Sequence, residues 1–80
     1  MQTNFVQVEC NLGKDYEVAY EVALNVDQIF EVYSTSGQFD LLIKCELPDY
    51  QDIRDFVTSL IQTLPGVADT LTTIAFKAFT

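Results

Sequence analysis

The stretch IFEVYSTSGQFDLLIKCE, residues 29–46, decides the fold of this 80-residue chain. Residues 29–33 are β-branched and aromatic, which is typical of a strand, and residues 39–46 form a second apolar run that alternates in period two. The segment from Ser34 to Gly37 is the clearest turn signal in the chain, because glycine tolerates a positive φ and hydroxyl side chains bond to nearby backbone. Two apolar runs joined by such a turn predict a β-hairpin.

A strand and a helix are predicted before the hairpin. Residues 5–10 alternate between apolar and polar side chains, which indicates a strand. From Asp15 the apolar spacing lengthens to that of an amphipathic helix of about three turns. Residues 27–28 end this helix and lead into the hairpin.

A second helix and a last strand are predicted after the hairpin. Pro48 and Asp49 open the helix, with Asp49 as the expected N-cap and Asp52 in the first turn, where the helix dipole favours acids. The helix carries a strong apolar stripe and ends at residues 65–66. Residues 67–79 are rich in threonine and apolar side chains and form the last strand.

The resulting order is strand, helix, strand, strand, helix, strand, in a single domain over residues 1–80. The apolar stripe of the first helix recurs in the second at a constant offset of 38 residues, so the chain is a doubled strand–helix–strand unit. Two such units sharing one sheet give a ferredoxin-like α+β fold. We expect a four-stranded antiparallel sheet, with the first and third strands central and both helices on one face.

The other face of this sheet has nothing in the chain to cover it. A domain of 80 residues buries only about 60% of its unfolded surface, so a partner subunit is a natural source of stability. An apolar patch on an otherwise acidic domain marks an interface, and we therefore expect dimerisation through the sheet. Its expected apolar members are Phe5, Tyr33, Leu42 and one register of the last strand, either Leu71 with Ala75 or Ile74 with Phe76.

The charge excludes several classes of partner. Twelve acidic residues stand against four basic ones, and the net charge is −8. The basic residues are scattered singly, whereas a nucleic-acid surface needs them clustered, so direct DNA or RNA binding is not expected. The same sign argues against an anionic membrane surface. No apolar run reaches the length of a membrane span and no signal peptide is evident, so we expect a cytoplasmic protein.

The residues of a common enzyme site are missing from the sequence. There is no histidine to activate a nucleophile or bind zinc, and no Gly-rich phosphate loop. Cys10 and Cys45 are expected to be small buried thiols, with a disulfide left open. Asp49, Asp52 and Asp55 are better explained as acids at a helix start than as a cation site, since the glycine and terminal glutamate of a calcium loop are absent. We predict no catalytic activity, metal or cofactor.

Two segments carry a family resemblance. Residues 32–44 contain Gly37, any residue, an aromatic, Asp40 and then an apolar strand, and this hairpin resembles that of the Lrp/AsnC ligand-binding domain. Residues 64–67, Leu-Pro-Gly-Val, are similar to the last helix–strand junction of that family. The resemblance spans nearly the whole chain, in order and with matching lengths.

The resemblance implies that the chain pairs its sheet with a second copy, in dimers that often assemble further into rings. It also implies binding of amino acids or related small molecules between subunits, with Gly37 and Asp40 lining the site and Ser36, Thr70 and Thr72 as further candidates. Chemically, bare backbone N–H groups at Gly37 suit a carboxylate and Asp40 suits an ammonium group. The alternatives are that Gly37 only serves the turn and that Asp40 bonds the turn's own backbone.

Three functions follow from these observations. The preferred hypothesis is a stand-alone domain, without a helix-turn-helix, that senses an amino-acid-like effector and oligomerises, in contact with full-length Lrp/AsnC regulators. The rival is a structural or protein-interaction module that co-assembles with such regulators and binds no effector. A third class, an α+β-barrel enzyme of the monooxygenase type, would require a polar or histidine-containing cavity that the sequence does not offer.

Overall fold

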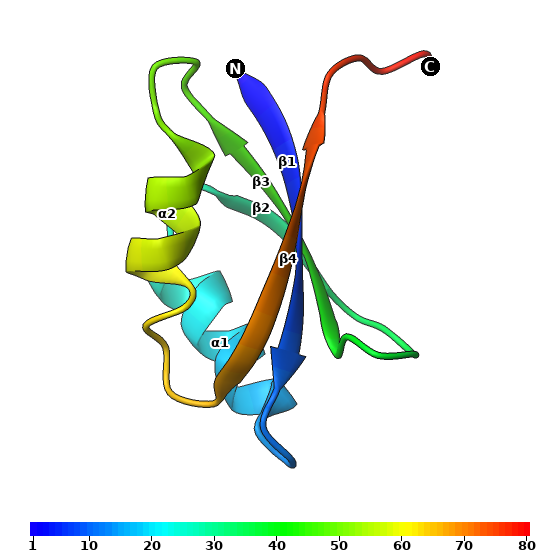
Figure 1. Cartoon of the computed structure of the whole chain (residues 1–80), viewed down its shortest axis with the longest axis vertical. Coiled ribbons are helices and arrows are strands. Elements are labelled where there is room, and N and C mark those ends of the chain that lie inside the picture. The colour runs from blue at the N-terminus through cyan, green and yellow to red at the C-terminus, as the bar shows by residue number, and fades with distance from the viewer.

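The structure, a computed structural model, describes the backbone of residues 1–80 and every side chain except that of Phe30. Its element order is the one expected from the sequence (Figure 1). The elements are β1 (Gln2–Cys10), α1 (Asp15–Asn25), β2 (Ile29–Ser34), β3 (Leu41–Leu47), α2 (Ile53–Leu60) and β4 (Val67–Ala75).

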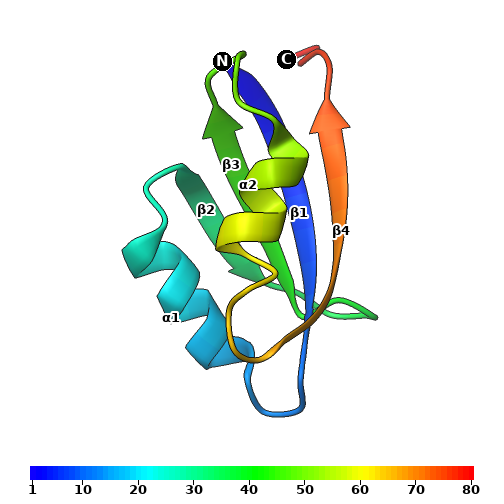
Figure 2. The ribbon, with the colours of Figure 1, turned by 60° about the vertical axis from the view of Figure 1, so that its left-hand side comes forward.

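The four strands form one antiparallel sheet in the order β2-β3-β1-β4. The first and third strands are therefore central, which confirms the predicted topology. Both helices lie on one face of the sheet, as Figures 1 and 2 show from two directions. The arrangement is the ferredoxin-like fold, and it leaves the second face of the sheet uncovered by any helix.

The core lies between the sheet and the helices. Along β3 every second side chain is buried, because successive strand residues point to opposite faces. In α1 the buried side chains are Val18 and Val22, one turn apart, and in α2 they include Phe56, which is 2% exposed. The buried apolar set comprises Val6, Val8, Val18, Val22, Val26, Leu41, Ile43, Cys45, Leu47, Ile53, Phe56, Val57 and Ile61.

The start of α2 differs from the sequence prediction. The N-cap is Asp52, whose Oδ1 accepts a hydrogen bond of 2.8 Å from the backbone N–H of Arg54. The sequence predicts Asp49 in this role, but a tight turn closed by Gln51 N–H to Pro48 O at 2.9 Å delays the helix by three residues. Asp49 instead lies 3.3 Å from the N-terminal amine of Met1.

Element ends also differ from the predictions. Helix α2 ends at Leu60 and a wider turn follows, in which the N–H of Gln62 donates to the carbonyl of Val57, five residues back, at 2.8 Å. Strand β4 ends at Ala75, which pairs with Thr3, rather than at residue 79, because β1 begins at Gln2 and offers residues 77–79 no strand to pair with.

The uncovered face, here called the open face, consists of the strand residues that point away from the helices. The register places Phe5 opposite Lys44 and Thr73, and Leu42 opposite Tyr33. Of the two registers considered for the last strand, Leu71 and Ala75 share this face, since they pair with Gln7 and Thr3 of β1. The full set is Thr3, Phe5, Gln7, Glu9, Glu31, Tyr33, Leu42, Lys44, Glu46, Asp69, Leu71, Thr73 and Ala75.

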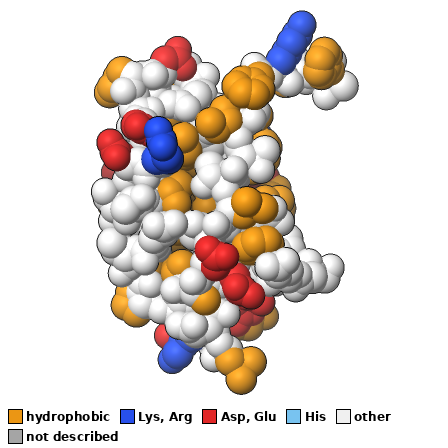
Figure 3. Space-filling view, in the orientation of Figure 1, with side chains coloured by type: hydrophobic (Ala, Val, Ile, Leu, Met, Phe, Trp, Pro, Cys, Tyr) orange, Lys and Arg blue, Asp and Glu red, His pale blue; other side chains and the backbone are white. Residues whose placement is uncertain are grey.

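The open face is partly apolar and remains accessible in the single chain. The side chains of Tyr33 and Leu71 are each 50% exposed. Figure 3 views the molecule with the edge strand β4 in front. It shows hydrophobic side chains beside a cluster of carboxylates on this side of the sheet. Neither helix among the described residues is long and apolar enough to cross a membrane.

Candidate functional site

The β2–β3 hairpin, which carries three of the predicted site residues, is closed by three interactions at its base. Ser34 pairs with Leu41, the N–H of Thr35 donates to the carbonyl of Asp40 at 2.9 Å, and the Thr35 hydroxyl donates to the carbonyl of Phe39 at 3.0 Å. The connection is therefore longer than the predicted turn and runs over residues 35–40. It leans away from the helices, toward the open-face side (Figure 1).

Ser36 and Gly37 lie at the exposed tip of this connection. Gly37 has a φ of +103°, a conformation that side chains with a Cβ rarely adopt, and nothing lies within 4 Å of where its Cβ would stand. The glycine is required for the shape of the turn, and the space around it is open. Both features leave the neighbouring backbone accessible to a ligand.

Asp40 ties the hairpin to the end of β1. Its N–H donates to the carbonyl of Val8 at 2.9 Å, and its Oδ2 accepts a hydrogen bond of 2.7 Å from the N–H of Cys10. A bond of this kind to an ionised acceptor is among the stronger hydrogen bonds in proteins. The carboxylate thus bonds backbone thirty residues away rather than the backbone of its own turn. Among the described groups, Oδ1 accepts no hydrogen bond.

Thr70 and Thr72 lie elsewhere on the sheet. They pair with Val8 and Val6, whose side chains are fully buried under the helices, so the two threonines share the helix-side face. The hydroxyl of Thr70 accepts a hydrogen bond of 2.8 Å from the amide of Gln62, in the turn after α2. The hairpin tip leans to the opposite side of the sheet.

One chain therefore does not bring the five predicted site residues together. Ser36, Gly37 and Asp40 form one group at the hairpin, and Thr70 and Thr72 form another on the opposite face. Their shared role in effector binding stays a prediction. A site that used both groups would have to be completed by a neighbouring subunit.

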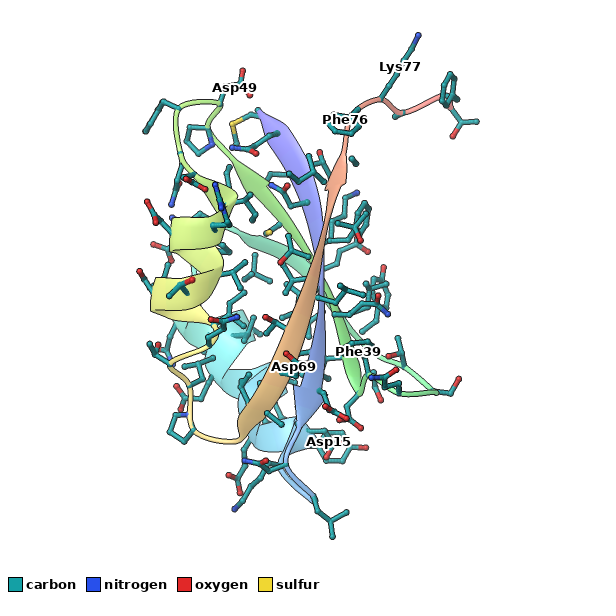
Figure 4. All side chains as sticks on the ribbon, viewed as in Figure 1. Asp15, Phe39, Asp49, Asp69, Phe76 and Lys77 are labelled. Carbon is teal, nitrogen blue, oxygen red and sulfur yellow. The ribbon has the colours of Figure 1, made fainter. Side chains whose placement is uncertain are left out.

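A hollow of about 410 Å³ lies at the other end of the open face, where β1 begins and β4 ends. Its lining is partly apolar and partly cationic, and the C-terminal residues that carry Phe76 and Lys77 project beside it (Figure 4). Sequence reasoning placed Phe5 on this face but did not identify the hollow, because its far wall is the irregular C-terminal segment. It is lined by Met1, Thr3, Phe5, Lys44, Ala75, Phe76, Lys77 and Ala78.

Both cysteines are free thiols, which answers the question that the sequence left open. Burial raises the pKa of the Cys45 thiol to about 11. Burial, and then the charges of Asp40 and Asp15, raise the pKa of the Cys10 thiol to about 11 as well. A raised pKa keeps a thiol protonated at neutral pH, and the protonated form is a poor nucleophile. Cys45 is thus a small core residue, as expected, whereas Cys10 is only partly buried and packs against the edge of the core.

Comparison with known proteins agrees with this structure. The sequence profile of the Lrp/AsnC ligand binding domain matches residues 3–80. The HTH-type transcriptional regulator FL11 of Pyrococcus horikoshii is 36% identical over 73 residues, which cover 91% of this chain and 47% of that protein. The leucine-responsive regulatory protein of Escherichia coli K12 is 31% identical over 75 residues, covering 91% of this chain and 46% of that protein. The chain thus spans about half the length of these curated relatives.

Solved structures show the same fold. The crystal structure of TTHA0845 from Thermus thermophilus superposes with a TM-score of 0.90 at 34% identity, over 100% of this chain and 99% of that one. The structure of Escherichia coli AsnC superposes with a TM-score of 0.85 at 23% identity, over 99% of this chain and 53% of that one. The family profile, the curated relatives and the fold lead to one conclusion: this chain belongs to the Lrp/AsnC family, and it is the ligand-binding domain of that family.

Proposed function

We propose that this domain binds an amino-acid-like effector between subunits and self-associates through its open face. The observation that carries the proposal is the match of the Lrp/AsnC ligand-binding domain to residues 3–80. The name of the E. coli relative states that it is leucine-responsive, so an amino acid is the first effector class to test. The curated relatives are transcriptional regulators, which supports a regulatory role in the cytoplasm rather than a catalytic one.

The hairpin offers the two chemical functions that an α-amino acid needs. Exposed backbone N–H groups around Gly37 suit the carboxylate, and Oδ1 of Asp40 suits the ammonium group while Oδ2 holds the N–H of Cys10. Because the hairpin leans past the open face, a subunit paired there would supply the remaining wall. The domain itself does not contact DNA in this proposal, since its net charge of −8 would repel phosphate.

A thermal-shift screen against the common amino acids, leucine included, tests effector binding. A ligand that binds only the folded state increases the free energy of unfolding, by about 2.7 kcal/mol at a ligand concentration of one hundred times its Kd. The melting temperature rises as a consequence. In the Asp40→Asn variant an amide oxygen can still accept from Cys10, but the charge that attracts the ammonium is lost. The shift should therefore shrink in Asp40→Asn and persist in Asp55→Asn, a matched change on the exposed start of α2.

If no amino acid in the panel raises the melting temperature, the sensor hypothesis is rejected and the rival is favoured, a module that co-assembles with full-length regulators.

Self-association is tested separately by analytical ultracentrifugation. Leu71→Lys places a charge on the open face and should shift the protein toward monomer. Leu12→Lys changes a fully exposed loop residue and should leave the sedimentation unchanged. A parent chain that is monomeric at micromolar concentration would contradict the pairing itself.

A further inference from the structure

The outer side of helix α1 carries a stripe of large apolar side chains that the fold does not use. Tyr16, Tyr20 and Leu24 are 71%, 66% and 76% exposed, and are here called the outer α1 stripe. They stand four residues apart, so they lie beside one another along one side of the helix, away from the buried Val18 and Val22. The exposed parts of the two tyrosines alone amount to on the order of 300 Å². A patch of that size on a monomer is often functional.

A hollow adjoins the stripe. It measures about 570 Å³ and is lined by Glu17, Tyr20, Glu21 and Pro65, so the turn after α2 forms its second wall. Two acidic side chains and an aromatic one therefore line the same hollow. This combination suits a guanidinium or ammonium group, which is attracted both by carboxylates and by the ring of a tyrosine. The lining matches a basic side chain that belongs to a larger partner covering the stripe.

The charges around the stripe select the partner. Helix α1 has Asp15 and Glu17 in its first turn and no basic residue in its last turn, so the negative end of its dipole lacks a cation. Oε2 of Glu17 lies 3.6 Å from Nζ of Lys14 in an ion pair, and Oε2 of Glu21 accepts a hydrogen bond of 2.8 Å from the side-chain amide of Asn25. A second copy of this chain packed stripe to stripe would bring further carboxylates onto these, and like charges in contact oppose association.

We propose that the outer α1 stripe docks a basic, amphipathic helical segment of a partner protein. Apolar side chains of that segment would cover Tyr16, Tyr20 and Leu24, and an arginine or lysine would enter the hollow between Glu17 and Glu21. A helix suits the stripe because three positions spaced by four residues extend about 12 Å along α1, a little over two turns. The surface lies on the helix side of the sheet, so it is independent of the open face and of the hairpin (Figure 2).

The probe for the test is a synthetic helical peptide of roughly five turns with leucines along one side and arginines flanking them. Its affinity for the intact chain is measured by fluorescence anisotropy, and the contact is mapped by amide chemical shifts. A scrambled peptide of the same composition controls for simple attraction to an acidic protein. We expect the ordered peptide to bind at least about tenfold more tightly than the scrambled one and to shift the amides of α1.

Variants decide whether the stripe carries the binding. Tyr20→Ala should weaken the ordered peptide by about 30-fold, the effect of removing a central anchor of an interface. Tyr50→Ala, which removes another exposed tyrosine in the turn before α2, is the matched control and should leave the affinity unchanged. Circular dichroism checks that both variants fold. Because the Tyr20 side chain is largely exposed, truncating it should leave the fold intact.

Equal affinity for the two peptides, or shifts confined to the open face, would overturn the proposal. Self-association of the parent chain that Tyr20→Ala abolishes would also overturn it, because the occupant would then be a second copy. None of these outcomes depends on an amino-acid effector, so the sensor proposal fails or survives separately.

Discussion

Replacing Asp40 with alanine is expected to destabilise the domain even in the absence of any ligand. The Oδ2 of Asp40 accepts a 2.7 Å hydrogen bond from the N–H of Cys10, in a partly buried position. Hydrogen bonds to charged groups contribute about 1.5–3 kcal/mol, and leaving a donor unpaired has a similar cost. Because water can reach part of this site, we expect a loss of about 2 kcal/mol. For a chain of this length that lowers the melting temperature by roughly 8–16 °C.

The assay is thermal unfolding followed by circular dichroism, with urea unfolding as an independent measure. Asp40→Asn keeps an oxygen acceptor and should recover at least half of the lost stability. Asp55→Ala removes an exposed carboxylate and should change the free energy of unfolding by no more than about 0.5 kcal/mol. If Asp40→Ala melted within about 4 °C of the parent, the range allowed for the control, the hydrogen bond to Cys10 would not hold the hairpin.

Three further predictions concern the frame of the fold. Asp52→Ala should cost about 1 kcal/mol because it removes the N-cap of α2, whereas Asp49→Ala should cost less than half of that by urea unfolding. Gly66→Ala should lower the melting temperature more than Gly37→Ala does. Both positions have a positive φ, but only at Gly66 would the new Cβ lie 2.9 Å from another side chain, that of Lys14. The free energy of unfolding should fall as pH rises from about 9 toward 11, because the pKa of the Cys45 thiol is raised to about 11 in the folded state and the unfolded chain releases this proton first. Urea unfolding across that range should show a smaller fall in Cys45→Ala.

The architecture was predictable because local pattern and long-range pairing agree. Period-two runs, two amphipathic stripes and the turn at Gly37 each indicate one element, and chain connectivity then leaves few ways to order the strands. The errors occur where pairing overrides the pattern. Residues 2–4 are polar and lie outside the predicted strand, yet all three pair with β3, and residues 3 and 4 also pair with β4.

The candidate site was less predictable than the fold. The motif around Gly37 located the exposed turn, but sequence spacing gave no sign that Asp40 bonds the backbone of Cys10, thirty residues away. It also gave no sign that Thr70 and Thr72 lie on the face opposite the hairpin tip, since the face of a strand residue depends on its register with a neighbour. Only the three-dimensional pairing separates the two groups.

The two proposed surfaces are compatible because they lie on opposite sides of one sheet. The open face would be covered in a dimer, and the hairpin of each subunit would then lie beside its partner. Helix α1 lies on the other side of the sheet, so the outer α1 stripe of each subunit would remain on the outside of that dimer (Figures 1 and 2). A basic partner would therefore meet two equivalent docking sites, and binding at one would raise the effective concentration at the other. Leu71→Lys, which should dissociate the dimer, is accordingly expected to weaken a two-site partner while leaving a single-site peptide unaffected.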